Sequence, residues 1–102
     1  MIAQFTLIPV GTKIDSLSKL LAKAMRSVVE SGLDYKVGAM GTTLEGDWYQ
    51  IMHCINRCRK TLLRECSRVE ISIFIDDRKG VQKQIVGKVK SLERKMSLRL
   101  KK

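Results

Sequence analysis

Aromatic residues, histidine and proline are scarce in this chain of 102 residues. Phe, Trp and Tyr together make up 5% of it, and it has one Pro and one His. No apolar run approaches the roughly 18 residues that a membrane-spanning helix needs. Residues 1–4 run directly into a strand pattern, without the segments of a signal peptide. We therefore expect a cytoplasmic protein with no membrane partner.

Cysteine is also sparse, and the count of three is odd. An odd count is a poor disulfide framework and suits a reducing compartment, so we expect free thiols. The spacing of His53, Cys54 and Cys58 invites a metal hypothesis, but structural zinc sites close with four ligands from two segments. The chain has no second cluster and no second histidine. Thiols packed in the core are therefore the favoured interpretation, and no metal is expected.

The sequence offers no set of catalytic residues. His53 is the only side chain that titrates near neutral pH unperturbed, and its predicted helix position faces away from the apolar stripe. Asp76 and Asp77 are adjacent in a predicted strand, so their side chains point to opposite faces. Turn and capping roles suit them better than paired acid–base catalysis. We expect a binding protein and no enzyme.

Positive charge is concentrated in the second half of the chain. Residues 1–50 hold five Lys/Arg and five Asp/Glu, whereas residues 51–102 hold fifteen and five, for a net charge of +10. Such asymmetry favours nonspecific polyanion binding, and a nucleic-acid-associated protein that uses its last helix is the alternative function. Residues 79–102 contain no aromatic side chain on which bases would stack. A solvated helix face is therefore the simpler interpretation.

Hydrophobic periodicity predicts seven elements. Residues 2–10, 35–39 and 68–77 alternate as strands, and residues 41–46 form a turn with a short strand. A first helix, with Asp15 or Ser16 as its cap, carries an apolar face from Leu17 to Val28 and stops at Gly32. A second helix begins at the cap Asp47, and its stripe comprises Trp48, Ile51, Ile55, Cys58, Leu62 and Cys66. A third carries a stripe from Val81 to Met96.

This order predicts an α+β, ferredoxin-like split βαβ sandwich over one domain, residues 1–102. It reads βαββαβ with an added C-terminal helix, and the helices cover one face of an antiparallel sheet. The open face is too apolar to be left in water, so we expect a second copy to cover it. Its predicted residues are Gln4, Thr6, Ile8, Met40, Ser72 and Phe74.

The segment from Met40 to Trp48 is dense in groups that bind small molecules. It combines two hydroxyls, a carboxylate, small residues and a flat aromatic within nine positions, which suits a small heteroaromatic ligand. Its glycines do not match a phosphate-binding loop. The alternative is a plain hairpin followed by a helix start, with Trp48 as a core anchor.

Five segments together resemble a known family. They are Thr6–Thr12, Ser16-Leu17-Ser18, the Glu30-Ser31-Gly32-Leu33-x-Tyr35 run, the Met40-Gly41-Thr42-x-Leu44-Glu45-Gly46-x-Trp48 run, and Ile73-x-Ile75-Asp76-Asp77-Arg78. In this order they resemble the small thiamine-binding, YkoF-like proteins, and the run ending in Trp48 is the most specific.

The resemblance implies a function as well as the fold. It implies sheet faces that pair into a homodimer, dimers that pair into a homotetramer, no enzymatic activity, no cofactor, and thiamine or a hydroxymethylpyrimidine-like precursor as the ligand. An aminopyrimidine would match hydroxyls and a carboxylate. A thiazolium cation needs local acid, from Glu45 and Asp47, beside Trp48. The expected ligand-binding residues are Gly41, Thr42, Thr43, Glu45, Trp48, Met40, Gln4, Thr6 and Phe74.

Overall fold

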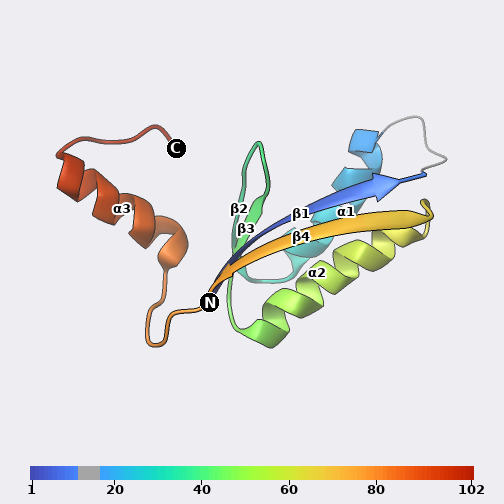
Figure 1. Ribbon diagram of the computed structural model, residues 1–102, viewed down its shortest axis with the longest axis horizontal. Helices are drawn as coiled ribbons and strands as arrows, with labels where there is room; N and C mark the ends of the chain where they lie inside the picture. Colours follow the sequence, from blue (N-terminus) through green and yellow to red (C-terminus); the bar gives the residue numbers. More distant parts are fainter. Residues whose placement is uncertain (12–16) are drawn as a thin grey trace.

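The computed structural model describes residues 1–11 and 17–102, and these form four strands and three helices (Figure 1). Asp15 and Ser16, the predicted cap of the first helix, lie outside the described residues. The elements are β1 (Ile2–Val10), α1 (Leu17–Glu30), β2 (Asp34–Val37), β3 (Thr42–Glu45), α2 (Trp48–Leu63), β4 (Arg68–Asp76) and α3 (Gln84–Met96).

The four strands form one antiparallel sheet in the order β2-β3-β1-β4. Its longest ladder joins β1 to β4, from the pair Ile2 and Asp76 to the pair Val10 and Arg68. Helices α1 and α2 lie along the same face of this sheet (Figure 1). The predicted ferredoxin-like class is confirmed.

The core lies between the sheet and the α1–α2 layer. Alternation along β1 turns Ala3 and Phe5 into it, and the apolar stripes of both helices meet them. The fully buried members with the largest side chains are Leu20, Leu44, Ile51, Leu62, Val28, Cys54 and Cys58. The Cys58 thiol donates a hydrogen bond to the carbonyl of Ala24, 3.2 Å away, which joins α2 to α1.

Some predicted boundaries, and the predicted burial of Trp48, were wrong. Strand β2 ends at Val37 rather than at residue 39, because the amide of Gly38 donates to the carbonyl of Gly41 (2.9 Å) and turns the chain. Helix α2 ends at Leu63, so Cys66 lies beyond it although it is still buried. Trp48 begins α2 but is 54% exposed, so it is not a core anchor.

Helix α3 stands apart from the rest of the molecule, to the left in Figure 1. All thirteen of its residues are described, and none is buried. Its main contacts are with β3 and β2. Among the described residues, no helix combines the length and the apolar character needed to cross a membrane.

Candidate functional site

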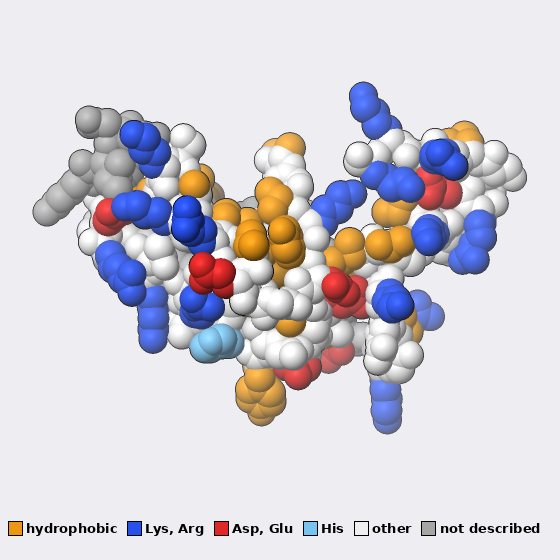
Figure 2. Space-filling model, turned by 180° about the vertical axis from the view of Figure 1, so that it is seen from behind, with side chains coloured by type: hydrophobic (Ala, Val, Ile, Leu, Met, Phe, Trp, Pro, Cys, Tyr) orange, Lys and Arg blue, Asp and Glu red, His pale blue; other side chains and the backbone are white. Residues whose placement is uncertain are grey.

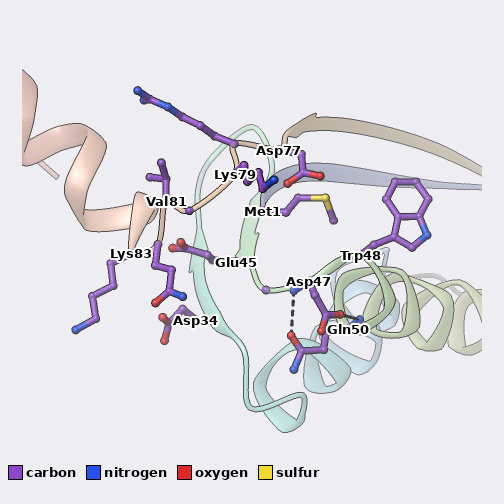
Figure 3. A pocket seen from close by; sticks show the side chains of 14 residues that line it. Met1, Asp34, Glu45, Asp47, Trp48, Gln50, Asp77, Lys79, Val81 and Lys83 are labelled. Atoms are coloured by element: carbon purple, nitrogen blue, oxygen red, sulfur yellow. Dashed lines mark hydrogen bonds between the residues drawn. The ribbon is translucent and has the colours of Figure 1, made fainter.

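A cavity of about 600 Å³ lies where β3 ends, α2 begins and the β4–α3 linker passes over them (Figure 3). The fixed walls come from the ends of β1, β2 and β3 and from the first turn of α2. The remaining wall is the linker. The lining residues are Met1, Asp34, Glu45, Gly46, Asp47, Trp48, Gln50, Asp77, Arg78, Lys79, Gly80, Val81, Gln82 and Lys83.

A capping box holds the α2 side of the cavity. The Asp47 carboxylate accepts from the amide of Gln50 at 2.8 Å, and the Gln50 side chain accepts from the amide of Asp47 at 3.0 Å. Gly46 precedes this box, and its amide donates to the carbonyl of Met1 at 3.0 Å. A Cβ at Gly46 would meet the Gln50 side chain at 2.9 Å and Leu33 at 3.0 Å, so glycine gives the turn its tight packing.

Glu45 joins the cavity to α3. Its Oε2 accepts from the amide of Gln84 at 2.8 Å, and its Oε1 accepts from the amide of Ile85 at 3.3 Å. Residue Lys83, at the N-cap position of α3, has φ 55° and makes no side-chain cap of its own. Glu45, which points toward the linker in Figure 3, therefore supplies the cap from a distant strand.

The cavity is acidic on one side, called its floor here, and basic along the linker that passes over it. Four lining carboxylates, those of Asp34, Glu45, Asp47 and Asp77, come from strand ends and the start of α2. The basic lining residues belong to the linker and are Arg78, Lys79 and Lys83. A cationic ligand against the floor would therefore meet carboxylates close by, even though the whole chain carries +10.

The nine predicted ligand residues do not come together in one place. Glu45 and Trp48 line the cavity. Gln4, Thr6, Thr43 and Phe74 lie on the open face of the sheet, where Gln4 pairs with both Thr43 and Phe74. The remaining three, Met40, Gly41 and Thr42, lie at the end of the β2–β3 hairpin. Ligand binding by the residues outside the cavity stays a prediction.

Thr42 differs most from the role expected of it. The prediction used the hydroxyls of Thr42 and Thr43 together, but neighbouring strand residues point to opposite faces. Thr42 is 6% exposed on the helix-covered face, and its hydroxyl lies 3.9 Å from the sulfur of Met25, to which it donates. Met40 is 85% exposed in the loop between β2 and β3, not on the open sheet face as predicted.

A second hollow, of about 490 Å³, lies between the hairpin, β1 and α1 and is mainly apolar. Met40, Gly41, Thr42 and Thr6 contribute to it, beside Leu21. A Cβ at Gly41 would come within 3.2 Å of the carbonyl of Phe5, so the hairpin approaches β1 closely here. The predicted site residues thus divide between two hollows and one sheet face.

Sequence reasoning missed the part of the cavity that comes from distant segments. Asp34 pairs with Glu45 across β2 and β3, and this register brings its carboxylate to the cavity. Asp77 and the linker enter from the end of β4. The turn signal at residues 76–80 was visible in the sequence, but nothing local showed that it would pass over Glu45.

The cysteines lie in the core, as predicted, and all three are free and buried. The neighbouring Cys58 side chain lowers the pKa of Cys54 to about 7, against the opposing effect of burial. The neighbouring Cys54 side chain, and then burial, raises the pKa of Cys58. Within residues 1–11 and 17–102, no three His, Cys, Asp or Glu side chains are placed to hold a metal ion.

The family model described as thiamine-binding protein matches residues 3–93. This chain belongs to that family. A UPF0045 protein of Methanocaldococcus jannaschii is 35% identical over 92 residues, which cover 90% of this chain and 91% of the relative. Another from Mycobacterium bovis is 30% identical over 95 residues, covering 92% of each.

Solved structures of similar chains support the fold. The crystal structure of the Methanocaldococcus jannaschii protein has a TM-score of 0.79 and covers 89% of this chain and 93% of its own. A Bacillus cereus domain of unknown function, 28% identical, has a TM-score of 0.75 and covers 83% and 84%. A Thermotoga maritima structure, named for thiamine biosynthesis/salvage, has a TM-score of 0.69 at 22% identity, covering 85% and 95%.

Proposed function

We propose that this protein binds thiamine or a hydroxymethylpyrimidine-like precursor in the cavity beside Glu45 and Trp48, without transforming it. The observation that carries the proposal is that these two residues, from the most specific part of the family motif, open onto one cavity. Membership of the thiamine-binding family supports the ligand class. A role as carrier, store or sensor follows from binding without chemistry.

The chemistry of the cavity suits this ligand class. Each Glu45 oxygen already accepts one backbone hydrogen bond, which leaves lone pairs for the amino group of an aminopyrimidine. Trp48 is half exposed, so its ring face is free to stack on a heteroaromatic ring. The carboxylates of Asp34 and Asp77 add the local negative charge that a thiazolium cation requires.

Calorimetric titration of thiamine and of hydroxymethylpyrimidine into the purified protein tests the proposal. Trp48→Ala should weaken binding by about 1–3 kcal/mol, the range for aromatic stacking on a base. Tyr49→Ala is the matched control, because Tyr49 is 82% exposed and does not line this cavity. Absence of heat from both ligands would refute the ligand class. Chromatography after long incubation should return the ligand unchanged.

Oligomerisation through the open sheet face is part of the proposal. Phe74 is 75% exposed and Ile8 is 53% exposed on that face, so two copies that pair there would bury both side chains. Such a pairing would be isologous, and a second isologous contact between dimers would give the expected homotetramer.

A second candidate, nonspecific binding of nucleic acid, is favoured by where the charge lies. Residues 78–102 carry ten Lys/Arg and one acidic residue, so they hold +9 of the net +10. Phosphate-driven binding should weaken steeply with added salt, since each neutralised phosphate releases counterions. Fluorescence anisotropy with a single-stranded oligonucleotide between 50 and about 200 mM salt measures this slope. Binding that is insensitive to salt would contradict it.

A further inference from the structure

The C-terminal arm, defined as residues 78–102, is held at its base. The amides of Gln84 and Ile85 donate to Glu45, and Lys88 forms an ion pair with Asp76 at the end of β4. In the far half of the arm the polar contacts are internal: Glu93 accepts from the amide of Leu100 at 2.6 Å. The arm therefore projects from a fixed base.

An apolar stripe on the arm is only partly covered by its own chain, in which α3 contacts β3 and β2. The stripe comprises Val81, Ile85, Val89, Leu92 and Met96; the first three are half-buried, the last two are exposed, and none of the thirteen α3 residues is buried. Leu92 is 50% exposed and Met96 is 47% exposed. The radius of gyration is 15.2 Å, whereas a compact chain of this length is expected near 13 Å. The arm accounts for this extension (Figure 1).

The β2–β3 hairpin presents a second uncovered apolar surface. Tyr35, Val37 and Met40 are 43%, 59% and 85% exposed. Figure 2 shows hydrophobic side chains along the hairpin in the middle of the molecule and others near the base of the arm, across an open notch. Lys and Arg cover much of the rest of the arm.

Charge distinguishes the hairpin from the other surfaces that the arm might cover. Residues 34–45, which form the hairpin, contain two acidic residues and one lysine, for a net charge of −1. Helix α1 contains three Lys/Arg and one Glu, and α2 contains three Lys/Arg and no acid. An arm of charge +9 is attracted to the first surface and repelled by the other two.

We propose that the arm of one copy packs its apolar stripe on the β2–β3 hairpin of a second copy, and that the second copy does the same in return. In such a two-fold contact each copy supplies both surfaces, and the notch between arm and hairpin receives the partner. This contact is separate from the open sheet face. Together, the arm contact and the sheet pairing would form a tetramer with two kinds of two-fold interface. The tetramer rests on the sheet pairing proposed above, but the arm contact itself does not.

Disulfide trapping between two distinguishable copies tests the contact. One chain carries Val37→Cys and the other carries Met96→Cys, and a tag fused to one of them makes their lengths different. The two chains are co-expressed, purified and oxidised with diamide. The three native cysteines are buried, which keeps the background low. The expected product is the mixed disulfide between residue 37 of one copy and residue 96 of the other. The matched control replaces Val37→Cys with Tyr49→Cys, at an exposed site on α2, and should trap little.

Each other result would overturn the proposal. Equal trapping by Tyr49→Cys would mean that the disulfides form by nonspecific collision. A dominant disulfide between two Met96→Cys chains would mean that arms pack on arms. A monomeric mass by light scattering would mean that the stripe stays uncovered. Leu92→Ser with Met96→Ser should lower the oligomer mass, whereas Lys90→Ser with Lys95→Ser should not. Phe74→Glu should halve a tetramer without abolishing the mixed disulfide, which separates this contact from the sheet pairing.

Discussion

The carboxylate of Glu45 lies 2.8 Å from the backbone amide of Gln84 and caps a helix that begins 39 residues later in the chain. The same carboxylate lines the candidate ligand cavity. The candidate cavity and the start of α3 therefore share one side chain.

Removal of this cap should loosen α3 without unfolding the protein. Losing an N-cap costs about 0.5–2 kcal/mol, and the loss is local because α3 buries no residue. In Glu45→Ala, hydrogen exchange at the amides of Gln84 and Ile85 should become about 2- to 30-fold faster. Glu30→Ala, which changes an exposed carboxylate outside the cavity, serves as the control. Unchanged exchange in Glu45→Ala would show that the contact does not hold the helix.

Acid should also loosen the arm, both at its base and in its far half. The hydrogen bond from Lys88 holds the pKa of Asp76 below its usual value, and the amide of Leu100 does the same for Glu93. Because both folded pKa values are depressed, the stabilisation is complete above the ordinary carboxyl values near pH 4 and is lost as the pH falls through the folded values.

Carboxyl carbon NMR across a pH titration checks this expectation. Lys88→Met should raise the pKa of Asp76 toward its ordinary value, because the donor of its hydrogen bond is removed. Lys95→Met, which changes a residue outside this ion pair, should leave the Asp76 titration where it is. An identical shift in both variants would mean that overall charge, not the contact, sets the pKa.

Sheet pairing should depend on Phe74. Phe74→Glu places a charge on the exposed apolar face, and burying an unpaired charge is strongly unfavourable. We expect light scattering to give half the native mass for this variant. Tyr49→Glu makes the same kind of change at an 82% exposed site on α2 and should retain the native mass. Equal losses in the two variants would place the effect outside the sheet face.

The core should show the usual sensitivity to cavities. Leu44 is fully buried between the sheet and the helices, and truncation of such a leucine to alanine costs about 2–5 kcal/mol. Urea unfolding should show that loss in Leu44→Ala. Val37→Ala, at a 59% exposed site on the neighbouring strand, should change the free energy of unfolding little. A small effect at Leu44 would contradict the packing described above.

Local patterns predicted most of the fold. Alternation in β1 and β4 and the stripe on α2 are set by residues two to four positions apart, and the Asp47 cap needs only its neighbour Gln50. The cavity was harder to predict, because Glu45 meets Asp34 through strand register and Gln84 through a long-range contact. The Thr42 and Thr43 side chains were grouped although strand geometry separates them, and that separation was readable from the sequence.

The cap on α3 also orders events during folding. A helix start is the costly part of helix formation, and here its cap comes from a strand rather than from the preceding turn. The stabilising contact exists only once β3 is in place, so α3 should gain its protection last and lose it first. We therefore expect the sheet to form while the strongly basic tail is still free, because the contact that caps α3 comes from a single carboxylate 39 residues away.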